Sequence, residues 1–129
     1  MEEKKKIFII DDDAFLLNMY SMKFEKNGFE TKVAGNGADA IEILRNGYKP
    51  DVLITDLIMP TMDGFSMYEV VKKENLAQGA LVVMLTNQGT ASDIDRAKAL
   101  GINSFIVKAT TIPSEVVEEV KALLSKYNK

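Results

Sequence analysis

The sequence predicts an α/β fold: a doubly wound (βα)5 three-layer sandwich around a five-stranded parallel sheet of order 2-1-3-4-5. Short apolar runs alternate with longer amphipathic stretches along the 129 residues, which is the pattern of repeated strand-helix units. Several of these runs are almost continuously apolar, as in strands that helices cover on both faces. The stretch 114–127 has a clear helical periodicity. Together these observations favour one domain with a single parallel sheet.

The first half of the chain predicts three strands and two helices. A strand is expected at 6–10, and a helix at 14–27 that Gly28 ends as a C-cap. A short strand at 31–34 precedes a helix at 38–46, which Gly47 ends. The stretch D-V-L-I-T at 51–55 is apolar enough for a fully covered strand.

The second half continues the alternation and predicts the remaining elements. A helix is expected at 65–74, followed at 80–85 by the most apolar strand, A-L-V-V-M-L. The helix at 92–100 ends at Gly101, and the last strand covers 104–107. Pro113 lies near the first turn of the helix at 114–127. Its apolar face consists of Val116, Val117, Val120, Leu123, Leu124 and Tyr127.

Composition excludes several classes of site and of protein. The chain has no Cys and no His, which rules out disulfides, Cys or His metal ligands and His-dependent catalytic triads. Basic residues are scattered apart from Lys4–Lys6, so no direct nucleic-acid contact is expected. No apolar run approaches the roughly 20 residues of a membrane span, and no signal peptide is recognisable. We therefore expect a cytoplasmic protein without a membrane contact.

Polar side chains follow four of the five expected strands. Asp11, Asp12 and Asp13 follow the first, Asp56 the third, Thr86 the fourth and Lys108 the fifth. Right-handed crossovers place the carboxyl ends of all the strands at one edge of the sheet, where ligands of such folds bind. We expect these side chains to converge there.

The chemistry of this set predicts phosphoryl transfer to an aspartate. Carboxylates without His or Cys favour a hard cation such as Mg2+. Lys108 and Thr86 would supply donors to an anion, and a carboxylate would supply the nucleophile. Each residue also has an ordinary interpretation: Asp13 as a helix N-cap, Asp56 as a turn residue, and Lys108 as a solvated lysine. The combination at four strand ends favours the functional interpretation.

In order and spacing, these motifs resemble the receiver domains of two-component response regulators, whose fold is CheY-like. The most specific segment is L-I-T-D-L-I-M-P-T-M-D-G at 53–64, which resembles the phosphoacceptor loop of that family. The segments I-I-D-D-D, M-L-T and F-I-V-K also match, and the resemblance covers essentially the whole chain. It implies a single receiver domain over residues 1–129, without an output domain.

The resemblance also implies a role for each site residue. Asp56 would be the phosphoacceptor, and Mg2+ would bind to Asp12 directly, to Asp11 mostly through water, to Asp56 and to the backbone carbonyl of Ile58. Lys108 would pair with Asp56 and then with the phosphoryl group. Thr86 would hydrogen-bond a phosphoryl oxygen, and Phe105 would occupy the aromatic switch position.

The resemblance implies that the protein is a signalling switch rather than an enzyme. Its own chemistry would be limited to self-phosphorylation and slow autodephosphorylation. The implied donor is a sensor histidine kinase or a histidine phosphotransfer protein, and the output partner is unknown. The surface expected to change comprises the helix at 92–100, the strand at 104–107 and the helix at 114–127. The protein would be a monomer or a phosphorylation-dependent dimer.

Three positions depart from the family pattern. Ala109 replaces the usual proline after the lysine, which predicts a trans Lys108–Ala109 bond because a non-proline cis bond costs ~2.5–4 kcal/mol. Asn87 replaces a small residue after Thr86, and the apolar Ile58 lies two residues beyond Asp56. We expect Ile58 and Asn87 to hinder the attacking water and to slow autodephosphorylation.

Two alternatives stay open at this stage. Asp11-x-Asp13 after a strand also resembles the first motif of haloacid-dehalogenase-like phosphohydrolases, in which Asp11 would be the nucleophile and Asp13 the general acid. That alternative leaves the loop at 56–64 unexplained. The second alternative is a degenerate receiver that only docks partners, against which the complete set of polar residues argues.

Overall fold

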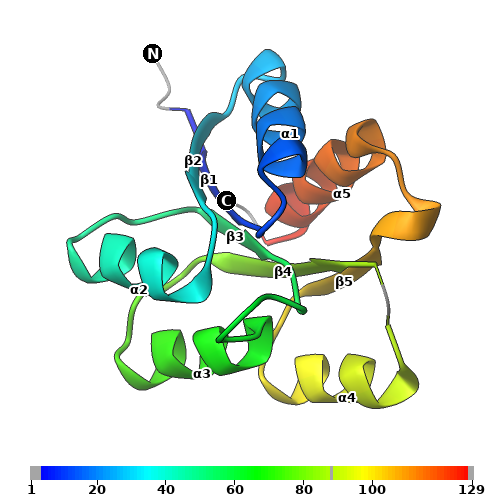
Figure 1. Ribbon diagram of the computed structural model, residues 1–129. Coiled ribbons are helices and arrows are strands. Elements are labelled where there is room, and N and C mark those ends of the chain that lie inside the picture. Colours follow the sequence, from blue (N-terminus) through cyan, green and yellow to red (C-terminus); the bar gives the residue numbers. More distant parts are fainter. Residues whose placement is uncertain (1–3, 88, 128–129) are drawn as a thin grey trace.

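The computed structural model describes residues 4–87 and 89–127, which form one parallel five-stranded sheet between two layers of helices (Figure 1). The strand order is β2-β1-β3-β4-β5, as the sequence predicts. The strands are β1 (Lys6–Ile10), β2 (Glu30–Ala34), β3 (Val52–Thr55), β4 (Leu81–Thr86) and β5 (Ser104–Val107). The helices are α1 (Ala14–Lys26), α2 (Gly37–Arg45), α3 (Gly64–Lys73), α4 (Ala91–Ala99) and α5 (Pro113–Lys126).

Polar side chains cap the N-termini of four helices, α1, α2, α3 and α4. Asp13, Asn36, Asp63 and Thr90 each accept a hydrogen bond from a backbone N–H of the first helical turn. These caps explain why α2, α3 and α4 each begin one residue earlier than the sequence predicts. The glycines expected to end α1, α2 and α4 all have positive φ, for example +88° at Gly28.

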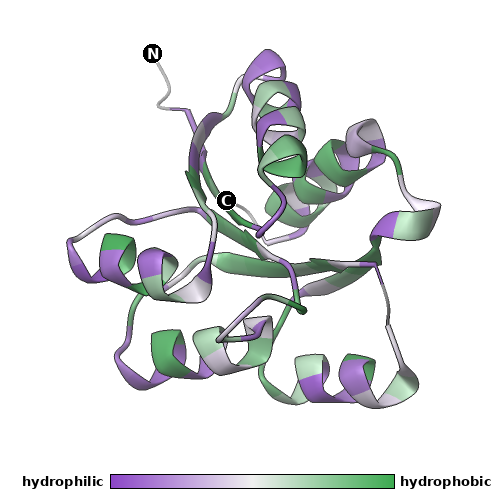
Figure 2. Ribbon diagram, in the orientation of Figure 1, coloured by the Kyte–Doolittle hydropathy of each residue, from purple (hydrophilic) through white to green (hydrophobic). Residues whose placement is uncertain are grey.

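Two hydrophobic cores cover the two faces of the sheet. Successive β1 residues alternate between them: Ile7 and Ile9 pack with α1 and α5, whereas Phe8 and Ile10 pack with α2, α3 and α4. Figure 2 shows the resulting pattern, with hydrophobic strands at the centre and mixed helices outside. Because both faces are covered, the carboxyl edge of the sheet is where its strand-end side chains can gather.

The two edge strands differ in character. β2 has charged side chains at Glu30 and Lys32, both exposed. β5 reads S-F-I-V, and all four residues are half-buried. A short 3-10 helix, η1 (Lys108–Thr110), follows β5 directly and was not expected from the sequence. It begins at the residue that projects into the cavity described next.

Candidate functional site

A cavity of about 370 Å³ lies at the carboxyl ends of the strands. The loops after β1, β3, β4 and β5 all contribute to it, so the convergence expected from the sequence is confirmed. Its lining residues are Asp11, Asp12, Asp13, Leu16, Asp56, Ile58, Thr86, Asn87 and Lys108. Phe105 is the one expected site residue that does not line this cavity.

A buried ion-pair network occupies the centre of the cavity. The Nζ atom of Lys108 donates to Asp56 Oδ2 at 3.0 Å and also to Asp11 Oδ2. The three side chains are only 6%, 9% and 4% exposed, respectively. The sequence predicts the pair with Asp56 but not the pair with Asp11, which forms because β1 and β3 are neighbours and end at the same level.

The surroundings shift the pKa values of two of these groups. Burial raises the pKa of the Asp11 carboxyl above its usual value, although the hydrogen bonds from Lys108 and from the backbone of Asp13 act in the opposite direction. Burial acts to lower the pKa of Lys108, but its hydrogen bonds to Asp11 and Asp56 outweigh that effect and raise it. Lys108 is therefore a cation at neutral pH despite its burial.

Three carboxylates form a candidate metal centre. One oxygen each from Asp11, Asp12 and Asp56 lies within 4.8 Å of the others. Asp11 and Asp56 are buried, whereas Asp12 is exposed, so solvent can reach the group. An all-oxygen set of this kind fits Mg2+ or another hard divalent cation.

Asp13, the third member of the acidic run, has a different environment. Its Oδ1 accepts from the backbone N–H groups of Phe15 and Leu16 at 3.0 and 3.2 Å, so it caps α1. A carboxylate that is engaged in this way is poorly placed to act as a general acid. This observation argues against the phosphohydrolase alternative.

The loop after β3 holds Asp56 tightly. The backbone N–H of Ile58 donates to Asp56 Oδ1 at 3.3 Å, and Gly64 N–H donates to the carbonyl oxygen of Leu57 at 2.8 Å. A Cβ atom on Gly64 would lie 2.3 Å from the Asp56 carbonyl oxygen, so this position requires glycine. The Ile58 side chain is 59% exposed and lines the cavity, as expected for a residue that overhangs it.

Thr86 and Phe105 lie on the neighbouring strands β4 and β5. The Thr86 hydroxyl is buried and has no hydrogen-bond partner in the described part of the chain. An unpaired buried donor beside three carboxylates fits an anionic ligand oxygen. The Phe105 ring packs instead against the loop between β4 and α4, where a Cβ on Gly89 would lie 2.5 Å from its Cε1 atom.

Sequence reasoning missed Gly89 and the geometry that follows β5. A glycine three residues after Thr86 and just before a helix was the available signal for a close backbone approach. The Lys108–Ala109 bond is trans, the form that the cost of a non-proline cis bond favours, since the described residues contain no cis peptide. Ala109 lies within η1, which turns the chain immediately after Lys108.

Comparison with known proteins identifies the family. A model of the response regulator receiver domain matches residues 7–121. The DNA-binding response regulator MtrA of Mycobacterium tuberculosis is 31% identical over 123 residues, which cover 95% of this chain and 52% of that protein. A probable transcriptional regulator ycf27 of Guillardia theta is 28% identical over 129 residues, and the chain spans about half the length of both relatives.

Solved structures agree with this assignment. The receiver domain of the Francisella response regulator 1452 superposes with a TM-score of 0.84 at 28% identity, covering 98% of this chain and 100% of that one. The Vibrio cholerae chemotaxis protein CheY4 has the same fold, with a TM-score of 0.85 over 93% of this chain and 98% of that one, at 24% identity. In the described part of the chain, no helix is long and apolar enough to cross a membrane. The chain belongs to the response regulator receiver domain family and is a signalling switch with a CheY-like fold.

Proposed function

We propose that Asp56 accepts a phosphoryl group from a phosphohistidine of a sensor kinase or phosphotransfer protein. One observation carries the proposal: the buried Asp56 carboxylate accepts a hydrogen bond from Lys108, and one of its oxygens lies within 4.8 Å of oxygens of Asp11 and Asp12. A nucleophile, a cation and a candidate metal centre thus share one cavity.

The transfer follows from these positions. A carboxylate oxygen of Asp56 attacks phosphorus in line, an O–P bond forms, and the P–N bond to the partner's imidazole breaks with its electrons on nitrogen. Lys108 neutralises charge on the transferring group, and the Thr86 hydroxyl donates to a phosphoryl oxygen. Asp11, Asp12, Asp56 and the Ile58 carbonyl would hold Mg2+, which supplies further positive charge against the phosphoryl oxygens.

Switching is a shift between two populations of the domain. Thr86 moves toward the phosphoryl oxygen, and Phe105 takes the space it leaves, which changes the surface of α4, β5 and α5. To move a 1:99 equilibrium to 99:1, the phosphoryl group must favour the active state by about 5.5 kcal/mol. That surface is where an output partner would distinguish the two states.

Trapping the phosphorylated residue tests the proposal. The protein is incubated with acetyl phosphate and Mg2+, the acyl phosphate is reduced with borohydride, and the modified residue is mapped by mass spectrometry. Modification of Asp56, absent in Asp56→Asn and retained in the matched Asp95→Asn, supports the proposal. Modification of Asp11 would instead support a phosphohydrolase. Failure of the intact protein to bind beryllofluoride with Mg2+ would favour a docking-only receiver.

The lifetime of the acyl phosphate gives a separate test of the residues that overhang the site. We propose that the exposed Ile58 side chain and Asn87, which line the cavity, limit access of water to the phosphoryl group. Ile58→Asn should therefore lose phosphate faster than the wild-type protein. Equal decay rates in the two proteins would show that Ile58 does not hinder the water.

A further inference from the structure

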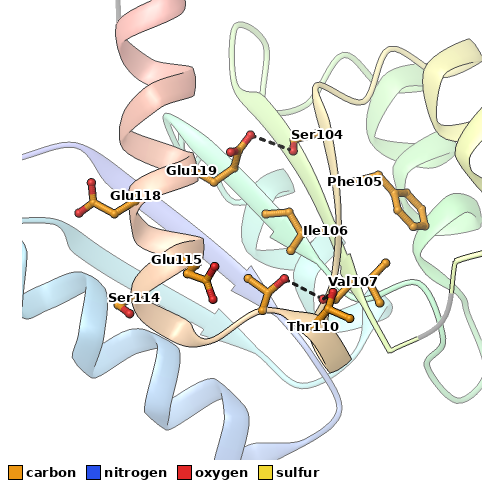
Figure 3. A pocket seen from close by; sticks show the side chains of 10 residues that line it. Ser104, Phe105, Ile106, Val107, Thr110, Ser114, Glu115, Glu118 and Glu119 are labelled. Carbon is orange, nitrogen blue, oxygen red and sulfur yellow. Dashed lines mark hydrogen bonds between the residues drawn. The ribbon is translucent and has the colours of Figure 1, made fainter.

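An open groove of about 670 Å³ lies between β5 and α5, outside the phosphoacceptor cavity. Figure 3 shows Ser104 and Ile106 directed toward α5, whereas Phe105 points to the opposite side of the strand. Phe105 nevertheless belongs to the lining of the groove, so β5 carries the aromatic residue of the switch and one side of the groove. Any shift of β5 would reach both.

The strand that borders this groove has one unpaired edge. Within residues 4–87 and 89–127, β5 lies at one end of the sheet and pairs only with β4. Charged side chains, proline or a bulge usually protect such an edge, but S-F-I-V contains no charged residue or proline. The opposite edge strand, β2, does carry charged residues. The Val107 carbonyl oxygen already accepts from the hydroxyls of Thr110 and Thr111, at 3.3 and 2.9 Å, so only the remaining outward-facing N–H and C=O groups of β5 can pair with an extended chain.

The wall of the groove is acidic. Glu115, Glu118 and Glu119 lie on one face of α5 at helical spacing and line the groove. One oxygen of Glu115 accepts from Ile112 N–H at 3.0 Å, and one of Glu119 accepts from the Ser104 hydroxyl at 3.3 Å. Their second oxygens have no partner among the described residues.

Among the residues that the structure describes, no cation lies within the groove to balance this wall. None of the lining residues is Lys or Arg. Lys121 lies 3.5 Å from Glu118, but both side chains are largely exposed, so this pair adds little. The complementary ligand is an extended segment with basic side chains. A two-fold symmetric pairing of two copies through β5 would place two sets of these carboxylates together, which disfavours a second copy as the occupant.

We propose that the groove between β5 and α5 binds an extended, lysine- or arginine-bearing segment of a partner protein, which adds to the β5 edge and pairs its cations with Glu118 and Glu119. The inference rests on the proposed function, because it identifies the class of partner that reads the switch. Phosphorylation changes the affinity of the groove for this segment through β5, since Phe105 belongs to the same strand.

Peptide binding tests the proposal directly. The probe is a fluorescent peptide of alternating lysine and valine, titrated by anisotropy against the whole chain with and without beryllofluoride and Mg2+. Glu118→Gln/Glu119→Gln should weaken binding at least about fivefold, from the loss of two ion pairs. The matched double variant Glu25→Gln/Glu30→Gln, near the other edge of the sheet, should bind as the wild-type protein does.

Two altered peptides and an NMR readout complete the test. A peptide with glutamate in place of lysine should not bind, and one with proline in alternate positions should bind much more weakly because it cannot pair with the edge. Amide shifts should concentrate on Ser104–Val107. Equal affinity for both double variants, shifts elsewhere, or dimerisation promoted by Glu118→Gln/Glu119→Gln would overturn the proposal.

The design separates this inference from the proposed function. If beryllofluoride fails to bind while the peptide binds with the predicted dependence on Glu118 and Glu119, the phosphoacceptor proposal is wrong and the groove assignment holds. If beryllofluoride binds and the lysine peptide does not, the groove assignment alone is wrong.

Discussion

Magnesium should stabilise this protein measurably, because its site concentrates negative charge. The oxygens of Asp11 and Asp56 lie no more than 4.8 Å apart, so at an effective dielectric of 20 the two buried carboxylates repel each other by at least about 3.5 kcal/mol. Lys108 offsets part of this, but three carboxylates and one ammonium leave a formal charge of −2. A divalent cation would neutralise it.

The size of the effect follows from ligand linkage. At a Mg2+ concentration ten times its Kd, the free energy of unfolding rises by about 1.4 kcal/mol. With an unfolding entropy of about 2.1 cal/mol/K per residue over 129 residues, Tm should rise by about 5 °C.

Thermal melts followed by circular dichroism provide the assay, with MgCl2 in the millimolar range compared with NaCl at equal ionic strength. Asp12→Asn should abolish the shift, and Asp95→Asn, which removes an exposed charge from α4, should retain it. The charge argument is refuted if MgCl2 and NaCl give the same Tm. A full shift in Asp12→Asn would refute the assignment of the site.

Three further predictions follow from individual contacts. Gly89→Ala should displace the Phe105 ring, seen as changed ring resonances by NMR, whereas Gly35→Ala meets no atom within 4 Å and should leave them unchanged. Tyr48→Phe should raise the free energy of unfolding by about 1 kcal/mol, because the buried Tyr48 hydroxyl has no partner in the described part of the chain. Burial raises the pKa of Tyr48 from 10.0 to about 12, so the wild-type protein loses stability as pH rises through that range, because the unfolded chain ionises first; denaturant melts of Tyr48→Phe should show a smaller loss there. Thr86→Val should leave the free energy of unfolding unchanged or raise it, and should weaken beryllofluoride binding. A loss of about 1 kcal/mol in the free energy of unfolding would show instead that the hydroxyl has a structural partner.

The fold and the residues that make up the site were predictable because both follow from patterns along the sequence. Apolar strand runs and helix-ending glycines placed each β-strand and α-helix within one residue of its observed bounds. Parallel topology then required Asp11, Asp56, Thr86 and Lys108 to meet at one edge. None of this depends on side-chain conformation.

The parts that were missed depend on local geometry that no periodicity encodes. The pair between Lys108 and Asp11 forms because the lysine, from the start of η1, reaches the carboxylates of both Asp11 and Asp56. The contact of Gly89 with Phe105 is set by the path of a loop. Both require the tertiary arrangement of segments that are distant along the chain.

The ion pairs of Lys108 also constrain when the site can exist. This lysine is 97 residues from Asp11 and 52 from Asp56, and it directly follows the last strand. During synthesis the two aspartates leave the ribosome first, and their counter-charge arrives only when β5 joins the sheet. The phosphoacceptor site therefore cannot assemble before β5 and Lys108 have left the ribosome.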